Sequence, residues 1–443
     1  MIRPRPETAA ATPRVAYVSP MPPARTGIAT YSAAVLRALD RSGYRARREI
    51  DVVWPVEERH LFEFHRYRLS VFHIGNNIEF HGGIYRLASN HPGVVVLHDL
   101  GLDDFVRGLM AQGDPLGIRA VREALLRAPD VSLPEARGND ALSPPWSAHI
   151  ARIARGIIVH SDFCRRYLED FGCRTPTFVV PHPLVEREDD LRRAEPRGRA
   201  IRERLGLGRD DPLVVAAGDL AEAKQLPALL AAVARLGAPC SVALVGRRIP
   251  GYDVDAIVRQ SGLGSRVTLA SDVSDEDFRA WLVAADVVVD LRFPHRGEVS
   301  GTLIRAMQVG RACVVSGIGT YLDITDGVVV HVGAGTPDPD ELATALRGLV
   351  ADRERRERLG SAARRYVEAT ASDERTAQGY EEAIERTLAL ALDPQRPALG
   401  RWARALNDLG IGAEQLDAGW GLSYARGLQE IADEVHRGEG LRR

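Results

Sequence analysis

Short apolar runs rich in β-branched residues alternate with longer helical patterns, and this alternation happens twice along the chain. Continuous apolar runs of this kind are typical of strands in parallel sheets, which are buried on both faces. The first series comprises residues 15–20, 69–75, 93–99, 156–161 and 177–182, and the second comprises 212–219, 241–246, 266–270, 286–291, 312–316 and 327–332. The sequence therefore predicts an α/β protein with two doubly wound, Rossmann-like domains, each built on its own sheet.

A charged segment poor in apolar residues, 185–211, lies between the two series. We expect it to hold the linker and the first amphipathic helix of the second domain, with the pattern broken by Pro196 and Gly198. A chain of 443 residues is too long for one hydrophobic core, which agrees with this division. The predicted parts are domains at 1–190 and 191–375, followed by C-terminal helices at 376–443.

Composition argues against several classes of protein. The net charge of −2 shows no excess of positive charge of the kind that nucleic-acid-binding proteins carry. No run reaches about 18 apolar residues, and the first residues lack the apolar core of a signal peptide, so we expect no transmembrane segment and a cytoplasmic location. Contact with a membrane surface through an amphipathic face stays open. The cysteines lack the spacing of a metal site and are expected to be reduced thiols: Cys164, Cys173, Cys240 and Cys313.

Lys224 is the only lysine among 58 lysine and arginine residues. It follows the predicted strand at 212–219 and precedes a predicted helix at 225–236, so it lies where doubly wound domains bind ligands. A compact ammonium on a flexible stem suits a phosphate group. The alternative is a solvated surface lysine that remains by chance in an arginine-biased composition.

A second candidate region follows the predicted strand at 286–291. Ser300, Gly301 and Thr302 open a helix there, and the free N–H groups at a helix start form an anion site. Gly301 removes the side chain that would keep a ligand away. Glu298, just ahead, is a carboxylate suited to sugar or ribose hydroxyls. The alternative is a plain turn followed by a capped helix.

The first domain offers two further candidates, Gly27 and His98. Gly27 lies in the loop after the first strand and lets the backbone approach a bound group. This loop has no G-x-G-x-x-G pattern, which argues against a dinucleotide cofactor. His98, followed by Asp99, ends the strand at 93–99 and can donate a hydrogen bond, transfer a proton or cap the next helix. We expect structural roles for the other histidines near strand ends, which are His73, His81, His160 and His182.

Together these segments resemble a GT-B glycosyltransferase, specifically glycosyltransferase family 4, over roughly residues 14–390. The resemblance rests on the order and spacing of several motifs, since no single one is decisive. The motifs are "PMPPARTGIATYS", "HIGNNIEFHGGIY", "VVLHDLGLDDF", "IIVHSDF", "AAGDLAEAKQLPALLAA", "LVGRRIPGYD" and "RGEVSGTLIRAMQVGRACVVS".

The resemblance implies a retaining hexosyltransferase that moves a sugar from a nucleoside-diphosphate sugar to an acceptor hydroxyl. The two domains would face each other across a cleft, with the donor on the second and the acceptor on the first. The late helices would cross back onto the first domain. We expect no metal and no other cofactor, because protein cations and helix ends neutralise the diphosphate in this family. Asp253 and Asp255 are interpreted as a helix start.

The same resemblance implies roles for individual residues. Lys224 would bind the diphosphate, His98 would lie near the transferred sugar, and Glu298 would complete the catalytic set. The donor-binding residues that it implies are Gly27, Arg247, Val273, Arg292, Ser300, Gly301 and Thr302.

Three positions depart from the family pattern. Asp219 stands where an arginine is common, so another cation must help to hold the diphosphate. Gln225 stands where many relatives have a second basic residue. Arg305 replaces the second of two glutamates, which usually holds the ribose, so ribose recognition and the identity of the donor stay open. The candidate cations are Arg247, Arg248 and Arg292.

Other functions stay open at this point. A non-catalytic scaffold or partner subunit would keep the same fold, as would a GT-B nucleotide-sugar epimerase. A sugar phosphorylase of this shape would carry pyridoxal phosphate on Lys224. The acceptor is a glycan, a lipid or a small metabolite, and residues 109–146 are long enough to shape its pocket. Residues after about 395 lie outside the matched region and would form a helical cap or a partner surface.

Overall fold

The computed structural model describes residues 14–133, 139–237 and 240–390. Within these residues there are two sheets of six strands each, in the orders β2-β1-β3-β4-β5-β6 and β12-β11-β10-β7-β8-β9. Every strand pairing is parallel. The predicted α/β class with two doubly wound sheets is therefore confirmed. We call the parts built on these sheets the first and the second domain.

The strands are β1 (Val15–Val18), β2 (Ile50–Val53), β3 (Leu69–Ile74), β4 (Val94–Leu97), β5 (Gly156–Val159), β6 (Thr177–Val179), β7 (Leu213–Ala217), β8 (Ser241–Gly246), β9 (Val267–Ser271), β10 (Val287–Asp290), β11 (Ala312–Ser316) and β12 (Val330–Val332). All except β2 fall on the predicted runs. β2 was missed because it is an edge strand with polar Asp51 and exposed Val52, so it lacks a continuous apolar run.

The helices of the first domain are α1 (Gly27–Arg41), α2 (Tyr44–Arg47), α3 (His60–Glu63), α4 (Ile78–Asn90), α5 (Asp103–Ala111), α6 (Pro115–Arg127), α7 (Ala148–Ile153) and α8 (Asp162–Asp170). Those that follow are α9 (Glu188–Arg204), α10 (Leu226–Ala234), α11 (Val254–Gln260), α12 (Asp275–Ala284), α13 (Gly301–Gln308), α14 (Pro339–Val350), α15 (Arg353–Thr370) and α16 (Asp373–Ala389).

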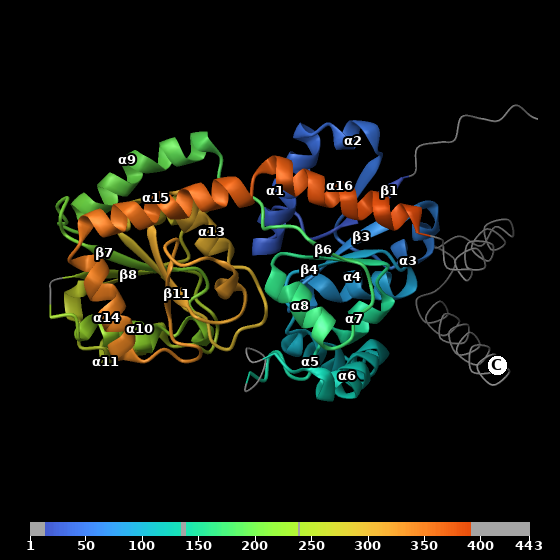
Figure 1. Cartoon of the computed structure of the whole chain (residues 1–443), viewed down its shortest axis with the longest axis horizontal. Helices are drawn as coiled ribbons and strands as arrows, with labels where there is room; N and C mark the ends of the chain where they lie inside the picture. The colour runs from blue at the N-terminus through green and yellow to red at the C-terminus, as the bar shows by residue number, and fades with distance from the viewer. Residues whose placement is uncertain (1–13, 134–138, 238–239, 391–443) are drawn as a thin grey trace, which may run out of the picture.

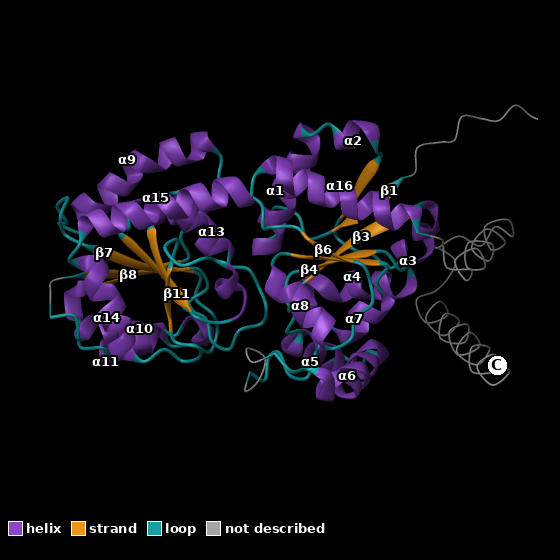
Figure 2. Ribbon diagram, in the orientation of Figure 1, coloured by secondary structure: helices purple, strands orange, loops and turns teal. Residues whose placement is uncertain are grey.

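The central strands of each sheet are buried on both faces, and helices cover both sides of the strands (Figure 2). Successive side chains of a strand point to opposite faces. In β3, Phe72 therefore joins one core cluster and Val71 the other. In β7, Val214 and Val215 divide in the same way. This burial explains why the strands are continuous apolar runs in the sequence.

Helix α9 runs through Pro196 and Gly198, so the predicted interruption is wrong. Gly198 is buried against α12, and a β-carbon on it would lie only 2.9 Å from a methyl group of Val283. Close packing of the two helices stabilises α9 despite the hydrogen bond that proline cannot donate. Because α9 begins at Glu188, the predicted boundary between residues 190 and 191 lies inside this helix.

Helix α16 follows the second domain in sequence but packs on α1 of the first domain (Figure 1). The hydroxyl groups of Tyr380 and Tyr31 are 2.8 Å apart, and both side chains are fully buried. Arg48 donates to Glu385 at 2.6 Å. The helix therefore ties the second domain to the first. The cap or partner surface expected after residue 395 lies outside the described residues.

Candidate active site

Loops from both sheets meet at the carboxyl ends of the strands. The loop after β10 contacts the loop after β4 through Arg296, whose carbonyl oxygen accepts from Leu100 N at 2.7 Å and Gly101 N at 2.9 Å. The Arg296 guanidinium also pairs with Asp103 at 2.8 Å. The loops that carry the predicted site residues therefore belong to two domains in direct contact.

Lys224 ends the 3₁₀ turn Glu222–Lys224 after β7 and is buried, so it is not a solvated surface lysine. Its Nζ donates to Asp290, the fully buried last residue of β10. Burial alone would raise the pKa of Asp290, but Lys224 and Arg292 outweigh that effect and lower it. Tyr321 Oη donates to the other carboxylate oxygen at 2.9 Å. Asp290 is not among the site residues predicted from the sequence, although an acidic residue at the end of an apolar strand is a signal for such a site.

Lys224 and the start of α13 converge on one point. A β-carbon on Gly218 would lie 3.5 Å from Lys224 Nζ and 3.2 Å from Thr302 Oγ1. Ser300 caps the helix, since its Oγ accepts from Leu303 N at 3.3 Å. The first N–H groups of a helix have no partner within the helix. An ammonium, a hydroxyl and a helix start thus lie together at the carboxyl edge of the second sheet.

Glu298 and Arg292 form a pair beside this point. Arg292 Nη1 lies 3.1 Å from Glu298 Oε1, and Arg296 N donates to Glu298 Oε2 at 2.7 Å. Burial alone would raise the pKa of Glu298, but Arg292 and His295 outweigh burial and lower it. The carboxylate is therefore ionised. Arg292 Nε is a buried donor without a hydrogen-bond partner among the described residues.

The other candidate cations are also paired. Arg247 donates to both carboxylate oxygens of Asp219, at 3.1 and 2.7 Å. Asp219 stands where the family commonly has an arginine, and its negative charge is therefore balanced by Arg247 in the loop after β8. Arg248 pairs with Asp255. Asp253 caps α11, since its carboxylate accepts from Ala256 N at 2.9 Å, and this confirms the predicted helix start.

Arg305 lies in a buried ionic cluster. Its Nε donates to Glu186, whose side chain is 1% exposed and is shared with Arg279. The Arg305 guanidinium also lies 4.6 Å from the centre of the Phe278 ring. Position 305 therefore anchors the segment between the domains, and its guanidinium cannot supply the ribose-binding carboxylate of the family pattern.

His98 is buried, and both of its ring nitrogens have partners. His98 Nε2 lies 3.1 Å from His73 Nδ1, and His98 Nδ1 lies 3.3 Å from His160 Nε2. Burial lowers the pKa of His98 well below its usual value, so the ring is neutral. A direct hydrogen bond from His98 to a sugar would have to replace one of these contacts.

One backbone carbonyl determines the tautomers of this histidine chain. His160 Nδ1 must donate, because its partner is the carbonyl oxygen of Val180 at 2.9 Å. The neutral His160 ring then accepts from His98 Nδ1, and His98 Nε2 accepts from His73 Nδ1. His73 Nε2 remains a buried acceptor without a partner among the described residues, as this order requires.

The histidines lie in a row that the sequence did not predict. Strands β3, β4, β5 and β6 are adjacent in the sheet, and each ends at or near one of them. The ring of Tyr31, from α1, lies within 5.9 Å of all of their ring centres. The members of this row are His73, His98, His160 and His182. In the sequence, the only indication of this row was that all four histidines lie at or near the ends of predicted strands.

Asp99 follows His98 and faces the second domain. Burial, together with the charge of Glu298, raises the pKa of Asp99 to about 7. One oxygen of Asp99 accepts from Asn76 N at 2.8 Å. Two carboxyl groups, one from each domain, therefore influence each other where the domains meet.

The remaining predicted residues lie in loops around this region. Gly27 is the first residue of α1, and a β-carbon on it would meet no atom within 4 Å. Val273 follows β9, between Asp272, which has a positive φ of 52°, and Ser274, the N-cap of α12. Space thus exists beside Gly27 for a ligand, whereas Val273 packs partly on the core of the second domain.

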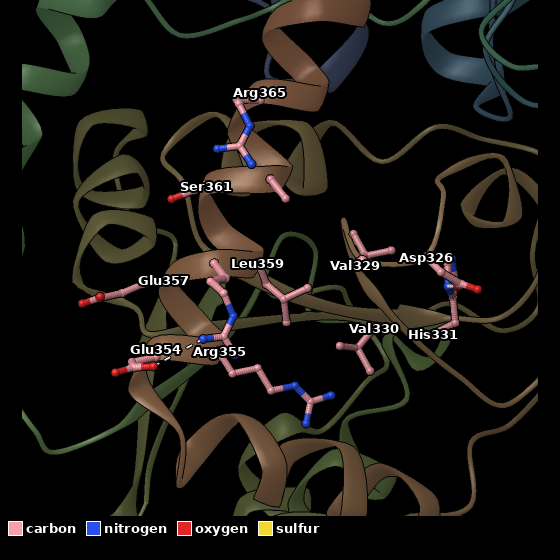
Figure 3. Close-up of a pocket in the computed structure, with 13 residues that line it drawn as sticks. Asp326, Val329, Val330, His331, Glu354, Arg355, Glu357, Leu359, Ser361 and Arg365 are labelled. Carbon is pink, nitrogen blue, oxygen red and sulfur yellow. Dashed lines mark hydrogen bonds and ion pairs between the residues drawn. The ribbon is translucent and has the colours of Figure 1, made fainter.

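A separate groove of about 1050 Å³ lies between β12 and α15 (Figure 3). The residues that line it include the apolar Val330 and Leu359 and the charged Glu354 and Arg358, which pair at 3.5 Å. None of the predicted site residues lines it. We therefore place the candidate site at the domain boundary, where strand-end loops converge.

The described residues contain neither a group of metal-ligating side chains nor a membrane-spanning helix. No three His, Cys, Asp or Glu side chains gather there in an arrangement that could hold a metal ion. No helix within the same residues has the length and apolar character needed to cross a membrane. Metal independence stays a prediction.

Comparison with known proteins gives a family for part of the chain. Residues 211–352 match the family model described as "Glycosyl transferases group 1". A D-inositol 3-phosphate glycosyltransferase of Xylanimonas cellulosilytica is 30% identical over 264 residues, which are 55% of this chain and 58% of that protein. The alpha-D-kanosaminyltransferase of Streptomyces kanamyceticus is 30% identical over 190 residues, 41% of this chain and 46% of that protein. The chain thus spans about half the length of these curated relatives.

Solved structures share the fold over most of the chain. The HepE protein of Anabaena, solved in complex with UDP and glucose, has a TM-score of 0.59 at 15% identity, covering 84% of this chain and 99% of that one. The sucrose-phosphate synthase of Thermosynechococcus elongatus has a TM-score of 0.59 at 19% identity, covering 86% and 100%. At these identities the similarity supports the fold alone.

Proposed function

We propose that this chain, which has the GT-B fold and a glycosyl transferases group 1 domain at residues 211–352, is a retaining glycosyltransferase of family 4. It moves a sugar from a nucleoside-diphosphate sugar to an acceptor hydroxyl. The observation that carries the proposal is the convergence of Lys224 Nζ, Thr302 Oγ1 and the start of α13 on one point. These groups suit a diphosphate at the carboxyl edge of a doubly wound sheet.

The chemistry follows from that arrangement. The bond between the sugar's anomeric carbon and the β-phosphate oxygen breaks, so negative charge builds on the leaving diphosphate. Lys224 and the N–H groups at the start of α13 stabilise this charge without reorganising, which is the main electrostatic device of many enzymes. The acceptor oxygen attacks the same face of the anomeric carbon, and its proton passes to the leaving phosphate. The sugar is thus transferred with retention.

The donor diphosphate enters a site whose cations already have partners. Lys224 is paired with Asp290, Arg292 with Glu298, and Arg247 with Asp219, so the side-chain charges nearly cancel. The same pairing favours a second candidate function, a GT-B subunit that binds its partner enzyme without catalysis. Binding of a nucleoside diphosphate distinguishes the two candidates.

The test is a thermal-shift screen of the purified protein with UDP, GDP, ADP and TDP, first with EDTA and then with Mg²⁺. A ligand that binds only the folded state increases the free energy of unfolding by mass action, by about 2.7 kcal/mol at a hundredfold excess over Kd, and Tm rises as a result. We expect one diphosphate to raise Tm in EDTA, and that diphosphate identifies the donor base. If Tm does not move with any of them, the non-catalytic candidate is favoured. A shift that requires Mg²⁺ contradicts metal independence.

A further inference from the structure

His182 has a position that the proposed function does not use. It follows β6, at the end of the histidine row, and its ring faces α13 of the second domain. A β-carbon on Gly301 would lie 3.5 Å from His182 Nε2 and 3.9 Å from His182 Cε1. The edge of the imidazole is therefore opposite the first residue of α13, where the proposed diphosphate binds.

The orientation of this ring is determined by its neighbours. His182 Nδ1 donates to the carbonyl oxygen of Pro183 at 2.9 Å, so the neutral ring has its lone pair on Nε2. The ring of Tyr31 packs against His182 at 5.1 Å with an angle of 75° between the planes. Within the described part of the chain, no hydrogen bond to His182 Nε2 is found. This nitrogen is therefore available to a ligand at Gly301.

The balance of charges near Gly301 leaves room for a further positive group, which His182 could supply. Lys224, Arg247 and Arg292 are each paired with a carboxylate, so a bound diphosphate would add negative charge that these three side chains do not balance. The start of α13 supplies only partial positive charge, equivalent to about half an elementary charge. An imidazole that gains a proton would supply one full charge and one N–H donor at the same place.

We infer that His182 is a further diphosphate-binding residue, which takes a proton from solvent onto Nε2 when the diphosphate binds at Gly301 and then donates that N–H to a phosphate oxygen. This inference rests on the proposed function and deepens it. Binding is accordingly linked to pH, and it strengthens as pH falls.

The surroundings of His182 agree with proton uptake on binding. In the protein without a ligand, burial lowers the pKa of His182 to about 4, so its ring is neutral at physiological pH before the diphosphate binds. The titratable groups that face it are Tyr31 from α1, and His160 and His98 from the ends of β5 and β4. These groups are neutral, because burial raises the pKa of Tyr31 and lowers the pKa of both histidines.

The charged groups of neighbouring elements are already engaged. Arg37 of α1 donates to Leu184 O at 2.6 Å and lies 3.7 Å from Asp373, and Glu186 is held by two arginines. Helix α13 places Gly301 opposite the ring, and its neighbours Ser300 and Thr302 do not titrate near neutral pH. The diphosphate would therefore be the first unbalanced charge beside His182.

The experiment measures calorimetric binding of whichever of UDP, GDP, ADP and TDP binds, between pH 7.0 and 8.5. Above pH 7 the second phosphate ionisation, near pKa 6, is nearly complete. Comparing buffers with different ionisation heats counts the protons taken up. We expect wild-type protein to take up close to one proton at pH 7.0 and to bind about tenfold or more weakly at pH 8.5. His182→Gln should lose both effects, while the control His331→Gln, in the groove of Figure 3, should keep both.

A second variant covers the case in which His182→Gln does not fold. Gly301→Ala leaves His182 in place, and its methyl group would meet His182 Nε2 at an ordinary contact distance of 3.5 Å. We expect this variant to fold and to bind the diphosphate at least tenfold more weakly at pH 7.0. Equal proton uptake in wild type and His182→Gln overturns this inference and leaves the proposed function intact. Unimpaired binding by Gly301→Ala also overturns this inference, and it shows that the diphosphate does not bind at the start of α13, where the proposed function places it. If wild type binds none of the diphosphates, both the inference and the proposed function are overturned.

Discussion

Lys224 has two roles at the scale of single residues, and they must be separated. It is 8% exposed and its partner Asp290 is fully buried, so each charge depends on the other. Removing one partner of a buried ion pair costs about 3–5 kcal/mol of stability, because the other charge is left uncompensated. Loss of activity after a simple replacement of Lys224 therefore does not by itself reveal a catalytic role.

A pair of variants separates the roles. We expect Lys224→Met to lose about 3–5 kcal/mol of unfolding free energy, and the double variant with Asp290→Asn to regain most of it, since no buried charge remains. Both variants should lose turnover by a factor of about 10²–10³, the loss typical of a removed oxyanion donor. Urea unfolding and initial rates with the identified donor measure the two effects. A stable double variant with wild-type turnover would assign Lys224 a structural role only.

Helix α9 illustrates how packing overrides local sequence at the scale of one element. Pro196 and Gly198 are poor residues for a helix interior, yet α9 continues through both. Pro196 is exposed, whereas Gly198 is buried at the contact with α12. Both residues disfavour a helix in the sequence, but in the structure only Gly198 is needed for close packing, because it lies against α12 while Pro196 faces solvent.

The two residues should respond to alanine with opposite signs. Pro196→Ala restores a backbone donor and should stabilise the protein by about 1–2 kcal/mol. Gly198→Ala gains about 1 kcal/mol of helix propensity but places a methyl group 2.9 Å from Val283, and such overpacking costs about 1–3 kcal/mol. We expect net destabilisation. Chemical denaturation of the two variants checks this, and a stabilised Gly198→Ala protein would show that α9 moves away from α12 at little cost.

The whole molecule brings Asp99 and Glu298 together from different domains. The pKa of Asp99 is raised to about 7, whereas an unfolded aspartate has a pKa near 3.9. Between these values the folded protein binds more protons than the unfolded chain, so folding stability falls as pH rises. Above pH 7 no further loss is expected from this group.

This linkage predicts a pH-dependent effect of Asp99→Asn. The variant cannot ionise, so its unfolding free energy should rise relative to wild type between pH 5 and 7, by roughly 1 kcal/mol per pH unit, and then level off. Urea titrations at pH 5, 6, 7 and 8 measure the difference. Asp130→Asn, at a half-exposed aspartate, is the control and should show no such trend. A constant difference across the pH range would refute the raised pKa.

The fold class and most strands were predictable because they depend on local patterns. An apolar run of β-branched residues is the signature of a strand buried on both faces, and only the polar edge strand β2 escaped it. The start of α13 was predictable for the same reason, since capping and glycine preferences act within a few residues. The burial of Lys224 was not, although its place after β7 was.

The sequence by itself thus determined the two sheets, the order of the loops and the residue types at their ends. Only the tertiary structure decided which charges pair: Asp219 with Arg247, Glu186 with Arg305, and Lys224 with Asp290. It also brought four histidines from neighbouring strands into one row and turned His182 toward Gly301. Such contacts join residues far apart in the chain. Their energies depend on burial and on strand order, and no local pattern encodes either quantity.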